Sequence, residues 1–367
     1  MDRGRFIRML ASGASVFSVS GFCRGGGLKH AKTDDPRPAD KDAGCQRLSL
    51  KALKEWQNLE YGMFIHFGMS TFTGNELDDG RSPASAYRPS ALDVGQWISV
   101  ARDAGMRYAV LTAKHVAGHC LWPTKCTPYN VSNSGDRTDV VGRFVREFGD
   151  KGVLPGLYYC SWDNHNRFGS KTPSDAGPEG AWSDMNRFPQ DPTGDLPFYT
   201  TSLYQNFQTA QITELLSWYG RIMEAWIDIP GLLGRGYRTF LYRHVSELQP
   251  DAVVMMNCCM EPAYAPDYAF PADIRAFERN LPSGYDGWET VNGKRVYLPG
   301  EFCQPIGKEW FHVEGDLPRS LDDLEKEFRF CRRNRINYLL DVPPDRRGLV
   351  PDACVRTLEG LRRRMGI

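Results

Sequence analysis

The sequence predicts an α/β protein whose strands form a (β/α)8-like barrel of the TIM-barrel type. From Leu48 onward, short apolar runs rich in β-branched and aromatic residues alternate with helical patterns. Such alternation is typical of parallel strands joined by helices. The 367 residues exceed a common domain size but suit a barrel of about 250 residues or more. No glycine-rich dinucleotide fingerprint follows the first strand, which disfavours an open Rossmann-type sheet.

The strands are predicted from short apolar runs, several of which end in polar residues. The first run is Tyr-Gly-Met-Phe-Ile-His-Phe, and the later ones are similarly rich in Val, Ile, Leu, Tyr or Trp. In chain order, the predicted strands are 61–67, 108–113, 153–159, 224–228, 252–256 and 337–342.

The helices are predicted from apolar residues three to four positions apart and from capping residues. The first begins at Ser90 as N-cap, places Trp97 and Ala101 on one face and ends before Gly105. The glycines between 231 and 236 do not open a helix directly after a strand, so this segment is predicted to be a loop. In chain order, the predicted helices are 90–104, 139–148, 201–219, 238–248, 321–333 and 352–364.

The charge balance and the cysteines exclude several classes of function. Lys and Arg together number 45, as do Asp and Glu, so the formal net charge is zero. The chain therefore lacks the excess positive charge of a general binder of nucleic acid or anionic membranes. Its ten Cys form no CxxC pair and no Cys/His group with zinc spacing. Neither a metal nor another cofactor is predicted.

The N-terminus has the pattern of an export signal. Basic residues from Arg3 precede a moderately apolar run that ends at Phe22, and this run is too short and too rich in Ser and Gly to span a membrane. We therefore expect an export signal over 1–23, with Cys23 as a candidate for lipid attachment, a linker over 24–45 and the barrel over 46–367. A periplasmic or secreted location follows from this expectation.

Ionisable and aromatic side chains follow the apolar runs, where a parallel barrel forms its active site. Carboxylates and aromatic rings are the groups that glycoside hydrolysis uses. A carboxylate that closes an apolar strand must be paired or face a pocket, which favours a functional role for Asp228. Taken alone, His66 is more typical of a buried core histidine, and Trp226 fits the core as well as it fits a site. The residues at the predicted strand ends are His66, Lys114, His115, Ser161, Trp162, Asp163, Asp228, Asn257 and Asp341.

Six ordered motifs between about residues 50 and 365 resemble glycoside hydrolase family 29, the α-L-fucosidases. The motifs are Trp56 with 61–68, then 70–76, 111–125, 139–141 with 156–163, 211–228 and 338–349. The resemblance implies a retaining hydrolase that removes terminal α-linked fucose from a glycan, with no cofactor. It also implies a barrel, here without the β-sandwich domain that many relatives append.

The resemblance further implies roles for individual residues. Asp228 corresponds to the nucleophile, and Glu278, five residues after Asp273, corresponds to the acid/base. Glu301 is the second candidate for the acid/base and Glu289 the third. The residues expected to bind the sugar are His66, Glu76, His115, Tyr158, Trp162, Trp226, Glu301 and Trp310.

The chain also departs from the family pattern. Val116 and Ala117 replace a His and an Asp, and His119 replaces a Phe. Ile229 stands where the family has Gly after the nucleophile, and Leu77 stands where it has Trp. These departures leave three alternatives open. One is a hydrolase of another terminal sugar, such as an α-galactoside. Another is a barrel that only binds glycans, and the third is a metal-dependent hydrolase that uses His66, His115 and His119.

Overall fold

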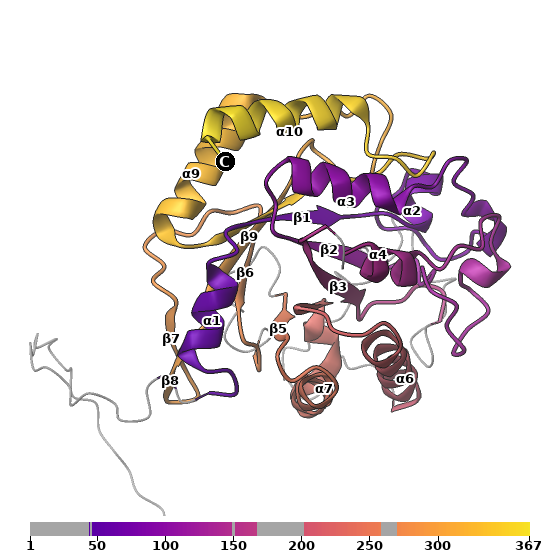
Figure 1. Cartoon of the computed structure of the whole chain (residues 1–367). Helices are drawn as coiled ribbons and strands as arrows, with labels where there is room; N and C mark the ends of the chain where they lie inside the picture. Colours follow the sequence, from indigo (N-terminus) through magenta and orange to yellow (C-terminus); the bar gives the residue numbers. More distant parts are fainter. Residues whose placement is uncertain (1–43, 45, 149–150, 167–201, 258–269) are drawn as a thin grey trace, which may run out of the picture. The chain divides into compact units, whose positions relative to one another are not determined.

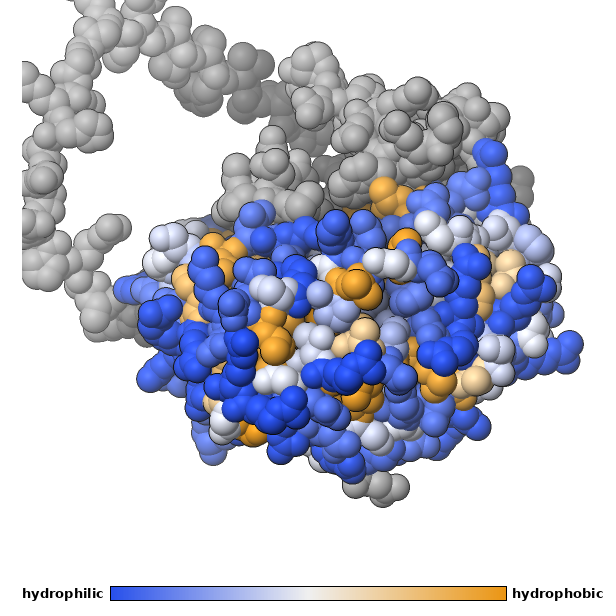
Figure 2. Space-filling model, turned by 90° about the horizontal axis from the view of Figure 1, so that it is seen from above, coloured by the Kyte–Doolittle hydropathy of each residue, from blue (hydrophilic) through white to orange (hydrophobic). Residues whose placement is uncertain are grey.

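The computed structural model describes residues 44, 46–148, 151–166, 202–257 and 270–367. The expected export signal and nearly all of the expected linker, residues 1–43 and 45, lie outside this described part. Within it, no helix is long and apolar enough to cross a lipid bilayer. The face of the molecule in Figure 2 is largely hydrophilic, with apolar residues scattered over it.

The described strands form the predicted parallel barrel (Figure 1). Its sheet has the order β5-β4-β3-β2-β1-β10-β9-β6, and a parallel bridge between Met255 and Ile274 links the two end strands. The barrel strands are β1 (Tyr61–Ile65), β2 (Tyr108–Lys114), β3 (Leu154–Cys160), β4 (Glu224–Asp228), β5 (Val253–Met256), β6 (Arg275–Glu278), β9 (Gly300–Pro305) and β10 (Asn337–Asp341).

Helices surround these strands, as expected for a barrel with helical crossovers (Figure 1). Two of them, α1 and α2, are not among the predicted elements. The helices are α1 (Leu50–Gln57), α2 (Met69–Thr73), α3 (Val94–Asp103), α4 (Val140–Phe148), α6 (Ser202–Trp218), α7 (Gly234–Leu248), α9 (Leu321–Asn334) and α10 (Asp352–Met365).

The structure corrects the start of the first predicted helix. Helix α3 begins at Val94, and Asp93 rather than Ser90 is its N-cap, because the Asp93 side chain accepts a hydrogen bond from the main-chain N–H of Gln96 (3.0 Å). The main chain before the helix is held by the loop near the C-terminus instead: the N–H of Ala91 donates to the carbonyl of Arg347 (2.8 Å).

The segment from 231 to 236 is also not the predicted loop. A short 3₁₀ turn, η4 (Pro230–Leu233), leads directly into α7, which begins at Gly234 rather than at Arg238. Barrel strands β6 and β9 were not predicted either. The segment between them contains an antiparallel hairpin of β7 (Trp288–Val291) and β8 (Lys294–Tyr297).

Alternate residues of β4 place two carboxyl groups at different depths along the barrel. Glu224, Trp226 and Asp228 are two positions apart, so their side chains lie on the same face of the strand. Glu224 and Trp226 are buried, and Asp228 lies at the C-terminal end of the strand, where the barrel opens. The strand thus places one carboxyl group in the barrel core and another at its rim.

Candidate active site

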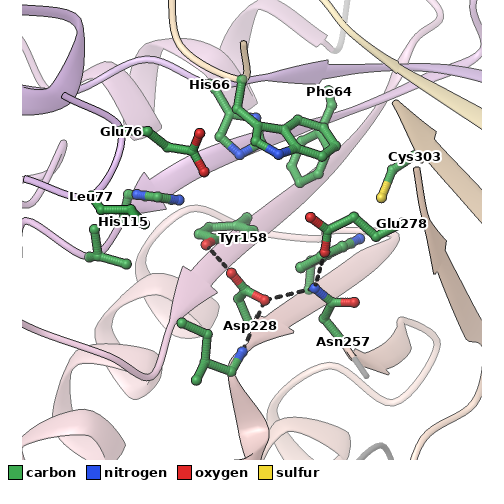
Figure 3. Close-up of a pocket in the computed structure, with 14 residues that line it drawn as sticks. Phe64, His66, Glu76, Leu77, His115, Tyr158, Asp228, Asn257, Glu278 and Cys303 are labelled. Carbon is green, nitrogen blue, oxygen red and sulfur yellow. Dashed lines mark hydrogen bonds between the residues drawn. The ribbon is translucent and has the colours of Figure 1, made fainter. Parts of the chain in front are cut away.

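A pocket opens at the C-terminal ends of the barrel strands (Figure 3). Every barrel strand except β10 contributes a residue from within the strand or the position after it, and residues from the connecting loops complete the walls. The lining residues are Phe64, His66, Glu76, Leu77, His115, Val116, Tyr158, Trp226, Asp228, Ile229, Asn257, Glu278, Cys303 and Trp310.

Asp228 lies in this pocket with both carboxylate oxygens engaged. Its Oδ2 accepts a hydrogen bond from the Tyr158 hydroxyl (2.6 Å). Its Oδ1 accepts the main-chain N–H of Ile229 (2.9 Å) and the side-chain amide of Asn257 (2.8 Å). Three donors thus stabilise the ionised carboxylate and fix its direction.

Glu278 faces the same pocket from the end of β6, and one amide group joins it to Asp228. The nitrogen Nδ2 of Asn257 donates to Oδ1 of Asp228 (2.8 Å) and to Oε2 of Glu278 (3.0 Å). Because both oxygens contact one nitrogen, they are at most about 6 Å apart, within reach of the roughly 5–5.5 Å typical of retaining glycosidases. Figure 3 shows this bridge.

The electrostatic setting of Glu278 keeps a proton on it near neutral pH. Burial and the nearby charge of Asp228 together raise its pKa to about 7, against the hydrogen bond from Asn257 and the charge of Arg279, which act to lower it. A carboxyl group that holds its proton at pH 7 can serve as a general acid.

A second lining carboxyl group, Glu76, comes from the loop after α2. Burial raises its pKa to about 7 as well, with Arg279 acting in the opposite direction. In Figure 3 it lies beside His66 and His115, away from the Asn257 bridge. The structure thus places one protonatable carboxyl group beside Asp228 and another near the two histidines.

His66 and His115 form the histidine side of the pocket. Nδ1 of His66 lies 2.9 Å from Oδ1 of Asp341, which also accepts the main-chain N–H of His66 (3.2 Å). Burial lowers the pKa of His66 to about 3 and that of His115 well below its usual range. Both rings are therefore neutral at physiological pH, and His115 stacks on Tyr158 (centroids 5.6 Å apart, planes 18° apart).

Departures from the family pattern give the pocket an apolar part. Leu77, Val116 and Ile229 all line it. His119 does not, because its Nε2 lies 2.8 Å from the Ser134 hydroxyl and its ring stacks on Tyr87 (centroids 5.0 Å apart). The histidine set of the metal-dependent alternative therefore does not converge, and among the described residues no three His, Cys, Asp or Glu side chains group as metal ligands.

Two residues expected to contact the sugar are not among those that line the pocket. Trp162 is buried, and its indole N–H donates to Asn164 (2.7 Å). Glu301 is fully buried in the barrel core and accepts hydrogen bonds from Tyr108 and Trp226. A sugar contact of either residue therefore stays a prediction. The third acid/base candidate, Glu289, pairs with Arg275 outside the pocket.

Several strand-end residues have structural partners instead. Lys114 and Asp163 form a buried ion pair (2.8 Å).

Asn257 and Cys303 were missed as site residues, although Asn257 is among the predicted strand-end residues. Cys303 had no signal, because its strand β9 was not predicted.

The family model of the α-L-fucosidases matches the chain over residues 81–366. Alpha-L-fucosidase 1 from Arabidopsis thaliana is 29% identical over 340 residues, which cover 86% of this chain and 60% of the relative. The chain therefore spans less than two thirds of the length of this plant relative.

Solved structures show the same architecture. Alpha-L-fucosidase isoenzyme 1 from Paenibacillus thiaminolyticus is 25% identical, with a TM-score of 0.67 over 86% of this chain and 75% of that one. An α-L-fucosidase from Lactobacillus casei in complex with α-L-fucose is 22% identical, with a TM-score of 0.67 over 86% of this chain and 98% of that one. At 22% identity, the second similarity concerns the fold alone.

Proposed function

The chain belongs to the α-L-fucosidase family, glycoside hydrolase family 29, and on this premise we propose that it is a retaining, exo-acting α-L-fucosidase. The observation that carries the proposal is the pair Asp228 and Glu278, which face one pocket within about 6 Å of each other. A pocket rather than an open groove suits the removal of one terminal sugar.

In the first step, the Asp228 carboxylate attacks the anomeric carbon of fucose while Glu278 gives its proton to the departing glycosidic oxygen. The C–O bond to the aglycone breaks as the bond to Asp228 forms, which yields a fucosyl-enzyme and a free alcohol. In the second step, ionised Glu278 takes a proton from water, whose oxygen displaces Asp228. Two inversions give net retention of configuration.

The position of the three candidate acids supports Glu278. It lines the pocket and contacts the same amide as the nucleophile. Glu301 lies beneath the pocket, and Glu289 is held by Arg275. Only a group that reaches the glycosidic oxygen can protonate it.

The choice of fucose rests on family membership. The apolar part of the pocket gives a reason to test a second sugar as well. Leu77, Val116 and Ile229 present no hydrogen-bonding side-chain group to a hydroxyl. A site without such bonds discriminates weakly between sugars that differ by one hydroxyl. A terminal α-D-galactoside is therefore the alternative substrate to test.

The test uses 4-nitrophenyl α-L-fucoside beside the α-D-galactoside and other aryl glycosides, with the wild type and Asp228→Ala. We expect release from the fucoside by the wild type, a loss of at least about a thousandfold in the variant, and an α-anomeric first product by NMR. Release from the galactoside alone would reassign the sugar. If no glycoside is cleaved, the result would favour the alternative that the barrel only binds glycans.

Azide rescue separates the candidate acids. In Glu278→Ala, a nitrophenyl leaving group still departs, but hydrolysis of the fucosyl-enzyme lacks its general base, so azide should accelerate turnover and yield α-fucosyl azide. Glu76→Ala and Glu301→Ala are the matched controls, and azide should not accelerate them. Rescue of either control in place of Glu278→Ala would move the acid/base to that residue.

We further propose that the protein is exported and acts on extracytoplasmic glycans. The support is the basic and apolar pattern that begins at Arg3 and ends at Phe22. Fractionation of cells that express the whole chain, with N-terminal sequencing of the product, tests it. An uncleaved cytoplasmic product would reject export.

A further inference from the structure

Glu301 is a carboxylate in the barrel core with two specific donors. The residue is 0% exposed. Its Oε2 accepts a hydrogen bond from the Tyr108 hydroxyl (2.7 Å), and its Oε1 accepts the indole N–H of Trp226 (3.1 Å). Burying a carboxyl group destabilises a fold unless its bonds are satisfied, so a core position occupied by Glu indicates a role that an apolar residue would not fill.

The contacts of Glu301 lead to the nucleophile in three steps. Trp226, which Glu301 holds, lines the pocket and stacks on Tyr158, with ring centroids 5.2 Å apart and planes 29° apart. The Tyr158 hydroxyl then donates to Oδ2 of Asp228 (2.6 Å). A rotation of the Trp226 indole would therefore displace the phenol ring that orients the attacking oxygen.

A second buried carboxyl group, Glu224, adjoins Glu301. Burial and the neighbouring charge of Glu301 raise the pKa of Glu224 well above its usual range. Burial raises the pKa of Glu301 to about 7, against the hydrogen bonds from Tyr108 and Trp226, which act to lower it. The pKa of Glu224 is raised further than that of Glu301, so Glu224 holds its proton to higher pH.

We propose that Glu301 is a positioning residue that holds Trp226, and through it Tyr158 and Asp228, in the geometry for attack. The expected fall in kcat rests on the proposed function, whereas the expected hold of Glu301 on the Trp226 indole does not. It assigns Glu301 no contact with the sugar and no role in proton transfer to the glycosidic oxygen.

The experiment compares Glu301→Gln, Glu301→Leu and Glu224→Gln. Gln at 301 keeps the size but weakens the acceptor, and Leu removes it. Gln at 224 reproduces the protonated state and leaves Glu301 intact. We expect kcat on aryl fucosides to fall about ten- to a hundredfold in Glu301→Gln and further in Glu301→Leu, with KM within about threefold. Glu224→Gln should stay within about threefold of wild type.

A readout that needs no activity follows the indole directly. In protein labelled with ¹⁵N at tryptophan, the Nε1–H resonance of Trp226 is identified by its absence in Trp226→Phe. It should shift clearly in both Glu301 variants and little in Glu224→Gln, because the carboxyl group that accepts the indole N–H is replaced only in the Glu301 variants.

The outcomes are distinct. An unchanged Trp226 resonance in Glu301→Gln, or equal kinetic losses in Glu301→Gln and Glu224→Gln, would overturn the positioning role. Azide rescue of Glu301→Ala would overturn it in favour of proton transfer. If the wild type cleaves no fucoside, the proposed function fails, while the resonance still decides whether Glu301 holds the indole.

Discussion

At the scale of single residues, the protonation of Glu278 should set the upper pH limit of activity. Its pKa is raised to about 7, and a general acid works only while it carries the proton. We therefore expect kcat/KM for a fucoside with a poor leaving group to fall as the pH rises through about 7. Glu278→Gln should lose this limb together with about 10²- to 10⁴-fold in rate.

Glu76→Gln is the matched control for this pH limb, because burial also raises the pKa of Glu76 to about 7. The limb should persist in Glu76→Gln. A pH–rate profile in which Glu76→Gln loses the limb and Glu278→Gln keeps it would assign the titration to Glu76.

Ile229 is a β-branched residue with φ of 52° and ψ of 49°, in the left-handed region that glycine favours. This conformation destabilises a residue with a Cβ by about 1–2 kcal/mol, whereas glycine adopts it freely. We expect Ile229→Gly to be more stable than Ile229→Ala by about 1 kcal/mol in denaturant unfolding.

The control for Ile229 is Val116, which is also buried beside the pocket but has no positive φ. There the usual order should hold, with Val116→Ala more stable than Val116→Gly by about 0.5–1 kcal/mol. If the Ala variant were more stable than the Gly variant at both positions, the backbone conformation of Ile229 would not destabilise the protein.

At the scale of elements, the N-terminus of α3 distinguishes two exposed residues three positions apart. Asp93 caps the helix, whereas Ser90 precedes it. Loss of an N-cap costs about 0.5–2 kcal/mol. Asp93→Ala should therefore lower the free energy of unfolding by about 1 kcal/mol, and Ser90→Ala by less than about 0.5 kcal/mol. Thermal or denaturant unfolding measures both, and equal losses would contradict the assigned cap.

The barrel strands that the sequence predicts share one property: an apolar run long enough to stand out. Strand β4 was predicted with its observed bounds because Ala-Trp-Ile separates two acidic residues. Strand β6 has four residues, two of them charged, and β9 contains Gly, Glu and Pro. Glu301 of β9 pairs in the core with Tyr108 of β2 and Trp226 of β4, and local sequence patterns do not record such distant partners.

At the scale of the whole molecule, the barrel interior depends on a glycine in β1. A Cβ at Gly62 would lie 2.5 Å from the Tyr108 ring, so the ring occupies the space that a side chain would take. Gly62→Ala should destabilise the protein by about 1–3 kcal/mol through overpacking. Denaturant unfolding followed by circular dichroism measures the loss.

Gly236, exposed in α7 with open space around its Cβ position, is the control for Gly62. Gly236→Ala should stabilise the protein by about 0.5–1 kcal/mol. Destabilisation by both substitutions, or by neither, would show that the ring of Tyr108 does not depend on the absence of a side chain at Gly62.

The barrel class and six of its strands could be predicted from alternating patterns, and family resemblance pointed to Asp228 and Glu278, which the fold brings to one pocket. The depth of a residue along the barrel could not be predicted. Glu301 is the second residue of β9, so it lies below the rim although its side chain points inward. Trp162 follows β3 by two positions, where the alternation of the strand no longer fixes its direction.

The amide of Asn257 acts as a spacer. Its NH₂ group has two hydrogens, and each is committed to a different carboxyl group, so neither is left for a sugar hydroxyl. The gap that a glycosyl group must bridge is therefore set by the covalent angle at one nitrogen rather than by the flexible stems of the two acids. We expect a substitution there to disturb the stereochemical course of the reaction before it weakens affinity.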